Sequence, residues 1–204
     1  SVRENPMGRE GSWLQTFTGV AFWPMDPRAD EVFLEDVAHA LALMNRFAGH
    51  TRVPYSVGEH SLRVSDEVFI RTGDMLLALC GLLHDGSEAY CVDVPTPLKP
   101  YLTGYKEIEA KVMEAIRERF NLPSEFWHHP EVKRADRVLL LTEARDLLGA
   151  AWGEGDPDVR AQSDVLVPLN WAVVEARFLY QAHYLLSAIG GTITVTDANT
   201  GRVV

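Results

Sequence analysis

Two histidines and two aspartates in three short segments have the residue types of a metal site. His60 lies within Val57–Ser61, the adjacent pair His84 and Asp85 closes an apolar run, and Asp136 follows a basic stretch. Imidazole nitrogens and carboxylate oxygens together suit a divalent ion, and the sequence leaves cobalt, manganese, zinc, iron and magnesium open. Because helices in a bundle hold such ligands rigidly, we expect one metal site built from three helices.

The adjacent pair His84-Asp85 is the sharpest of these signals. Neighbouring residues on a helix point about 100° apart, so both side chains reach one ion only where the helix ends or bends. Gly86 follows directly and is expected to supply the conformational freedom for that change. The alternative is that His84 caps the end of one helix while Asp85 caps the start of the next. Capping leaves His60 and Asp136 unexplained, which favours the metal site.

The elements that must position these residues are mostly helices. Apolar residues recur at three- and four-residue spacings, which is the pattern of helices with one buried face. Ser56 is a predicted N-cap, and Glu59 three residues later would complete a capping box. Pro95, Pro97 and Pro100 exclude a regular helix in their segment. The predicted helices cover residues 34–48, 57–70, 75–83, 105–120, 130–148 and 171–189.

Residues typical of β-strands gather near both ends of the chain. Residues 15–23 predict a short strand or hairpin, and residues 192–204 predict a terminal hairpin that could pair with it. The expected fold class is all-α: a single domain over residues 1–204, with a helical core at about 34–189 and a small β appendage from the termini.

The composition limits the partners of the chain. Its 204 residues include 19 Lys and Arg against 29 Asp and Glu, which gives a formal net charge of −10. This balance argues against nucleic acid and anionic membranes as partners, because phosphate binding needs clustered positive charge. Two cysteines cannot form a disulfide framework, and neither a signal-peptide pattern nor a long apolar run is found, so a cytoplasmic protein is expected. An anionic substrate must therefore be bound by local cations or by a metal.

With these ligands in place, the chain resembles a known family. His60, His84-Asp85 and Asp136 are similar to the H…HD…D signature of HD-domain metal-dependent phosphohydrolases. The resemblance extends through three longer motifs: Glu59-His60-Ser61, His84-Asp85-Gly86-Ser87-Glu88-Ala89 and Asp93-Val94-Pro95-Thr96-Pro97-Leu98-Lys99. These motifs resemble bacterial 5′-deoxynucleotidases and the related phage dATP triphosphohydrolases, over residues 34–148. The resemblance implies an HD-domain helical bundle with the metal on its axis, in bacterial or phage-infected cytoplasm, and leaves room for a homo-oligomer.

The resemblance also assigns catalytic roles to two acidic residues. The position that matches Glu88 acts near the attacking water or the leaving group in that family, and the position that matches Asp93 lies in the active-site loop. The chemistry of the sequence agrees for Glu88. It follows His84 by four residues, one helical turn if the helix resumes, and expulsion of a poor alkoxide leaving group needs a proton donor.

Five further positions match substrate-binding residues of the family. Arg46-Phe47 matches an arginine–aromatic pair that contacts phosphate and the sugar or base, Lys99 and Lys133 match phosphate-binding positions, and Pro97 matches one that lines the base. Phe47 stands where relatives commonly carry tryptophan and can stack on the sugar or the base, while Gly49 nearby leaves room. These two residues predict a preference for deoxyribose with relaxed base choice.

The expected function is hydrolysis of deoxynucleotides at the 5′ phosphorus with a divalent metal. The products would be deoxynucleoside and phosphate from a monophosphate, or deoxynucleoside and triphosphate from a triphosphate such as dATP; the sequence leaves both open. A phosphodiesterase of a cyclic or signalling nucleotide is an alternative, which the motif from Pro95 to Lys99 disfavours. A non-catalytic nucleotide-binding module is another, but it would normally have lost a metal ligand, and all four are present.

Overall fold

The computed structural model describes residues 8–150, 152 and 159–190, and most of these residues are helical. The predicted helical segments are confirmed, with shifts at some of their ends. The α-helices of the described residues are α1 (Leu34–Leu43), α2 (Val57–Thr72), α3 (Met75–Leu83), α4 (Glu88–Cys91), α5 (Tyr105–Arg119), α6 (Pro130–Glu143) and α7 (Trp171–Ala188).

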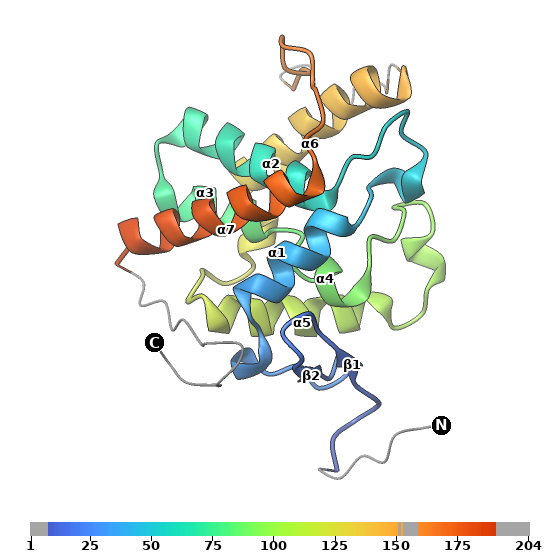
Figure 1. Ribbon diagram of the computed structural model, residues 1–204, viewed down its shortest axis with the longest axis vertical. Coiled ribbons are helices and arrows are strands. Elements are labelled where there is room, and N and C mark those ends of the chain that lie inside the picture. The colour runs from blue at the N-terminus through green and yellow to red at the C-terminus, as the bar shows by residue number, and fades with distance from the viewer. Residues whose placement is uncertain (1–7, 151, 153–158, 191–204) are drawn as a thin grey trace.

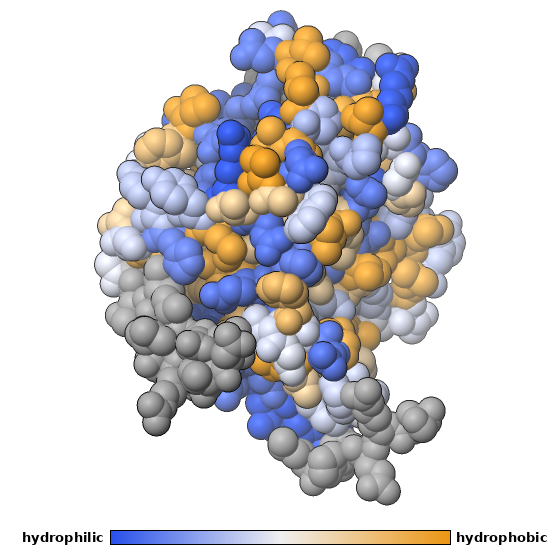
Figure 2. Space-filling view, in the orientation of Figure 1, coloured by the Kyte–Doolittle hydropathy of each residue, from blue (hydrophilic) through white to orange (hydrophobic). Residues whose placement is uncertain are grey.

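Helix α2 is the centre of the fold. It packs against α1, α3, α6 and α7, and α7 also contacts α1 and α3 (Figure 1). The buried faces of these helices share one apolar core, in which Val64, Leu79 and Phe178 are fully buried. On the face shown in Figure 2, apolar residues are dispersed among hydrophilic ones. None of the helices in the described residues has both the length and the apolar character that crossing a membrane requires.

A small hairpin precedes the helices, as the sequence predicts. Strands β1 (Leu14–Gln15) and β2 (Ala21–Phe22) pair antiparallel, with Leu14 opposite Phe22. The buried carboxylate of Asp36 in α1 accepts hydrogen bonds from the backbone N–H and the hydroxyl of Thr18, at 2.7 and 2.9 Å. These bonds fasten the hairpin turn to α1. The second predicted hairpin, at residues 192–204, lies outside the described residues.

Helix α1 ends earlier than predicted. It stops at Leu43 rather than at residue 48, because the next residues turn to an extended conformation and pair with the segment that leads into α2. The N–H of Arg46 donates to the carbonyl of Tyr55, and the N–H of Val57 donates to the carbonyl of Met44, both at 2.9 Å. Arg46 therefore lies in a loop tied to the start of α2.

The predicted N-cap of α2 is confirmed, but half of the capping box is wrong. The hydroxyl oxygen of Ser56 accepts a hydrogen bond from the N–H of Glu59 at 3.1 Å. The carboxylate of Glu59 accepts from the guanidinium of Arg63 and from the N–H of Leu169 instead of turning back to the cap. The start of α2 is thereby fastened to the segment before α7.

Helix α6 continues as a single π-helical turn over Ala144–Leu148. It ends at Gly149, whose φ of +66° favours glycine, and an added Cβ there would collide with the guanidinium of Arg52. The N–H of Arg52 also donates to the carbonyl of Leu147 at 3.1 Å. These contacts hold the end of α6 against the loop that follows Arg46.

Candidate metal centre

His60, His84 and Asp85 meet at one point of the fold. His60 lies in the first turn of α2, and His84 and Asp85 directly follow the last residue of α3. One ligand atom of each residue lies within 4.8 Å of the others, and Asp85 Oδ2 is 3.2 Å from His84 Nε2 and 3.7 Å from His60 Nε2. This trio could hold a metal ion, as the sequence predicts.

The hydrogen bonds of the two imidazoles favour a cation between them. His84 Nδ1 lies 2.7 Å from the carbonyl of Gly81, and His60 Nδ1 lies 2.6 Å from a carboxylate oxygen of Glu143. Because both partners accept, both Nδ1 atoms donate, and the Nε2 atoms face the trio. Both Nε2 atoms are buried and lack a hydrogen-bond partner among the described residues. Two buried Nε2 atoms beside a carboxylate fit a divalent ion, which would take the place of any proton on them.

Asp136 approaches the trio from α6. Its Oδ1 lies 3.2 Å from His60 Nε2. Burial raises the pKa of Asp136, but the neighbouring His60 and His84 outweigh burial and lower it to about 2. Burial likewise acts against ionisation of Asp85, but His84, His60 and Arg46 hold its pKa far below the usual range. Both carboxylates are therefore ionised at neutral pH, as metal ligands need to be.

A glycine is needed at position 86, just after the end of α3, but for a different reason than the one the sequence suggested. Its φ is not in the left-handed region, so conformational freedom is the wrong explanation. An added Cβ would lie 3.0 Å from the carbonyl oxygen of Leu83 and 3.1 Å from Ile116 of α5. The glycine is required because the turn that presents His84 and Asp85 packs closely against its neighbours.

Glu88 begins α4, one turn after the ligand pair. Its side chain is buried, and its Oε2 has no hydrogen-bond partner among the described residues. Burial, together with the charges of Asp85 and Asp93, raises the pKa of Glu88 well above its usual range. A raised pKa favours the protonated form of a carboxyl group, which can donate its proton to a leaving group.

Asp93 lies half-buried in the loop after α4. Burial raises its pKa, and Asp85 adds to this effect while Arg46 opposes it. The preceding residue, Val92, has a φ of +63°, which is strained for a β-branched side chain. Such strain is often concentrated at functional sites, and here it adjoins Asp93.

Arg46 reaches the trio from the loop between α1 and α2. Its Nε lies 3.2 Å from Glu143, and a terminal nitrogen lies 3.6 Å from Asp85 Oδ2. Its guanidinium carbon is 5.2 Å from the centre of the Phe47 ring. Phe47 and Ala48 both have positive φ values, at 55° and 50°, so this loop is a second strained segment beside the ligands.

The other predicted substrate-binding residues lie further out. Lys99 is half-buried and forms an ion pair with Glu109 at 2.9 Å, and its charge still lowers the pKa of Glu88. Pro97 is exposed in the loop after α4, and Lys133 is exposed on α6, one turn before Asp136. The structure thus brings Arg46 next to the ligands, while roles for Pro97 and Lys133 stay predictions.

Glu143 is a site residue that the sequence analysis missed. It is fully buried at the end of α6, and its carboxylate accepts hydrogen bonds from His60, from the hydroxyl of Tyr55 at 2.9 Å and from Arg46. Burial raises its pKa, but these partners outweigh burial and lower it. A signal was present: Glu143 follows Asp136 by seven residues, which is two helical turns, in an otherwise apolar stretch.

Trp152 also went unnoticed in the sequence. Its ring meets the Phe47 ring edge-on, with centroids 5.7 Å apart, and 42% of the residue is exposed. The contacts between the end of α6 and the loop after Arg46 explain why these residues, distant in sequence, meet. The order outward from the ligands is therefore Arg46, Phe47 and Trp152.

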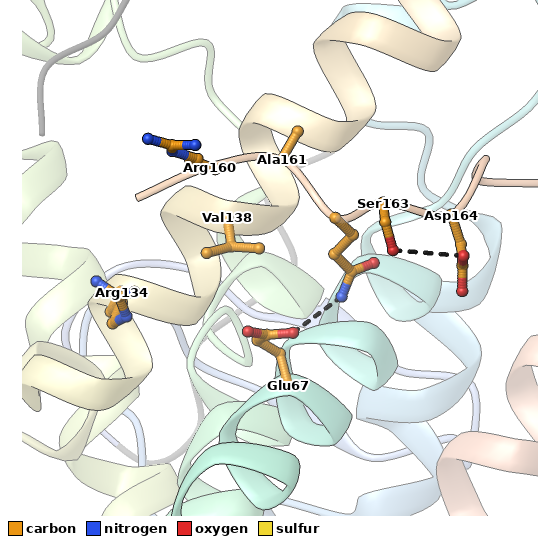
Figure 3. Close-up of a pocket in the computed structure, with 8 residues that line it drawn as sticks. Glu67, Arg134, Val138, Arg160, Ala161, Ser163 and Asp164 are labelled. Carbon is orange, nitrogen blue, oxygen red and sulfur yellow. Dashed lines mark hydrogen bonds between the residues drawn. The ribbon is translucent and has the colours of Figure 1, made fainter. Parts of the chain in front are cut away.

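A cavity of about 460 Å³ lies apart from these residues, between α2, α6 and residues 160–164 (Figure 3). The side-chain amide of Gln162 donates to Glu67 at 3.0 Å across it, and Arg134 and Arg160 also line it. None of the predicted site residues is among its lining residues. The candidate metal centre is therefore a separate feature of the molecule.

Comparison with known proteins identifies bacterial relatives. The chain is 39% identical over 136 residues to the uncharacterized protein YfdR of Escherichia coli, which covers 67% of this chain and 72% of the relative. It is 31% identical over 195 residues to an uncharacterized protein of Rhodobacter capsulatus, which covers 88% of this chain and 98% of that protein. No protein-family model matches the chain.

Proposed function

The chain belongs to the family that includes the Escherichia coli protein YfdR and the Rhodobacter capsulatus protein, and we propose that its site hydrolyses deoxynucleotides with a divalent metal. The observation that carries this proposal is the pair of buried Nε2 atoms of His60 and His84, which face Asp85 and lack hydrogen-bond partners in the described residues. Asp136 would complete the ligand set. The resemblance to HD-domain phosphohydrolases supports the same ligands and the same chemistry.

The bond to be broken joins the 5′ oxygen of the deoxyribose to phosphorus. A divalent ion at this site would lower the pKa of water and polarise a phosphoryl oxygen. Attack by a water oxygen would form the new bond to phosphorus and break the bond to the 5′ oxygen; the water gives up one proton, and the departing 5′ oxygen must gain one. Glu88 is suited to donate that proton, because its burial and acidic neighbours raise its pKa. Asp93 lies near enough to add to this effect.

The positive charge that an anionic substrate needs is local. Arg46 lies beside Asp85, and a guanidinium can bind phosphate through two hydrogen bonds. Lys99 lies near Glu88, and Lys133 is exposed on the helix that carries Asp136. We propose that Arg46 binds the reacting phosphate and that the lysines serve more distant phosphates. We propose that this activity is cytoplasmic, as expected for an enzyme of free deoxynucleotides.

One assay tests the proposal. The purified chain, stripped of metal and reloaded with cobalt, manganese, zinc, iron or magnesium, is given dAMP, dGMP, AMP, dATP, dGTP and a cyclic dinucleotide. We expect release of phosphate from deoxynucleoside monophosphates or of triphosphate from dATP and dGTP, with AMP hydrolysed more slowly. Cleavage of the cyclic dinucleotide alone, equal rates on dAMP and AMP, or no hydrolysis with any metal would contradict the proposal.

Variants of the three cations decide which phosphate chain is bound. If the substrate is a triphosphate, Lys99→Ala or Lys133→Ala should lower kcat/KM for dATP more than for dAMP. If it is a monophosphate, Arg46→Ala should cause the largest loss of kcat/KM for dAMP, and the two lysine substitutions should have little effect. Lys106→Ala is the matched control, because Lys106 is exposed at the start of α5. An equal effect of all four substitutions would reject this assignment of the phosphate contacts.

A further inference from the structure

Glu143 connects two parts of the site that the proposed reaction uses together. Its Oε1 accepts from His60 Nδ1 at 2.6 Å, and its Oε2 accepts from Arg46 Nε at 3.2 Å. We propose that Glu143 is a positioning residue, which aims His60 Nε2 at the metal and holds Arg46 beside Asp85 for the substrate phosphate. The part that concerns Arg46 rests on the proposed function, whereas the part that concerns His60 is a statement about metal binding alone.

The first step of the argument is the tautomer of His60. An imidazole that binds a metal through Nε2 must carry its remaining proton on Nδ1, and a carboxylate that only accepts hydrogen bonds enforces this arrangement. Both side chains are fully buried, so water does not compete for that proton. Loss of such an outer carboxylate typically weakens metal binding by about 10- to 100-fold.

The second step is that both oxygens of Glu143 must accept. A glutamine at position 143 would have nearly the same shape but only one acceptor oxygen. If that oxygen faced His60, its NH₂ group would face the Nε–H of Arg46, donor against donor. If the amide were reversed, its NH₂ group would face His60 Nδ1 and favour the tautomer whose Nε2 carries a proton and cannot bind a metal. One of the two functions therefore fails in either orientation.

The third hydrogen bond of Glu143 offers a way to test whether this residue positions its partners or only stabilises the fold. The hydroxyl of Tyr55 donates to the same Oε1 atom at 2.9 Å, and Tyr55 is buried. Removing this hydroxyl takes one hydrogen bond from the carboxylate but leaves its contacts with His60 and Arg46. If Glu143 served only to stabilise the fold, Tyr55→Phe and Glu143→Gln should resemble each other in every measurement.

The experiment measures the affinity of the folded protein for Co²⁺ by competition with a chelating dye. Glu143→Gln should weaken binding by about 10- to 100-fold, and Tyr55→Phe should change it by less than about threefold. Glu67→Gln is the matched control, since Glu67 is on α2 but bonds to Gln162. Circular dichroism establishes that each variant is folded. If Glu143→Gln does not fold, Glu143→Asp replaces it in the experiment. This variant should also weaken Co²⁺ binding, because its shorter side chain cannot span both partners.

Proton NMR of the Co²⁺-loaded protein adds a direct readout. In wild type we expect two exchangeable, paramagnetically shifted N–H signals, from His60 Nδ1 and from His84 Nδ1, which donates to Gly81. Glu143→Gln should lose or broaden the first and keep the second, which serves as the internal reference. Unchanged Co²⁺ affinity together with two intact signals would overturn the inference while leaving the metal centre in place. No Co²⁺ binding by wild type would instead reject the proposed function.

Inorganic phosphate tests the part that concerns Arg46. Titrated into the Co²⁺-saturated protein, phosphate should bind at least about fivefold more weakly to Glu143→Gln than to wild type, and equally to Tyr55→Phe. Equal phosphate affinity in Glu143→Gln would show that Arg46 does not depend on Glu143. Absence of phosphate binding in Co²⁺-loaded wild type would count against the proposed function, and the role of Glu143 toward His60 would stand on the affinity and the NMR.

Discussion

Replacing Asp85 with asparagine should separate metal binding from folding. Asp85 approaches both imidazoles and Arg46, and 23% of its side chain is exposed. Asparagine preserves the shape but removes the charge, so those groups lose their ionised acceptor. We expect Asp85→Asn to fold and to unfold at a lower temperature without metal. A loss of about 1–3 kcal/mol corresponds to roughly 2–12 °C for a chain of this size.

The rise in Tm that metal produces should also shrink. A metal at 100 times its Kd stabilises wild type by about 2.7 kcal/mol, which raises Tm by roughly 5–11 °C. If the substitution weakens binding about 100-fold, the same concentration contributes only about 0.4 kcal/mol, or about 1–2 °C. Thermal melts with Co²⁺, Mn²⁺ or chelator measure both values.

Asp66→Asn is the matched control for this measurement, since Asp66 is exposed on α2 and bonds to Gln181. It should retain the full shift that wild type shows with metal. A full shift in Asp85→Asn would remove Asp85 from the ligand set, and no shift in wild type would refute the metal centre.

Three further outcomes are expected. Glu88→Gln should lower kcat by about 10²-fold or more without changing metal content; normal turnover in the metal-loaded variant would end its role as proton donor. Because burial and Arg46 lower the pKa of His60 less than its carboxylate neighbours raise it, that pKa is about 9. A metal must then displace a proton, and calorimetry should show affinity rising about tenfold per pH unit from 7 toward 9; a flat profile would contradict this. Trp152→Leu should raise KM for dAMP severalfold but leave that for deoxyribose 5-phosphate unchanged, since only the base would reach the ring beyond Phe47; an equal change in both KM values would place Trp152 elsewhere.

The meeting of His60, His84 and Asp85 could be predicted from the sequence because the signals of these residues are local. His84 and Asp85 are adjacent and close an apolar segment, and an N-cap four residues before His60 fixes where α2 begins. Helix ends depend on residues a few positions away, so patterns within one segment suffice to locate them. The same reasoning misjudged Gly86, since the close contact with Ile116 that requires a glycine comes from α5, 30 residues later in the chain.

Glu143 and the early end of α1 could not be predicted in this way. The three hydrogen-bond partners of Glu143 lie 83, 88 and 97 residues away, so its role exists only once α2 and α6 are packed together. In the sequence, its spacing of two helical turns from Asp136 hints at a shared helix face but does not identify these partners. Helix α1 stops at Leu43 because Met44 and Arg46 bond with the strand-like segment before α2, a pairing that helical periodicity does not report.

Charge explains why an acidic chain could still bind an anion at this site. Three carboxylates there have lowered pKa values and are ionised: Asp85, Asp136 and Glu143. Arg46 and protonated His60 offset two of these charges, so the group carries a net charge of −3 + 2 = −1 and repels phosphate. A divalent ion adds two charges and displaces the proton of His60, which brings the sum to 0 and presents a cation directly to the phosphoryl oxygens. On the proposed function, this charge balance favours binding of the metal before the nucleotide, and the same carboxylates that make the site acidic would attract the metal.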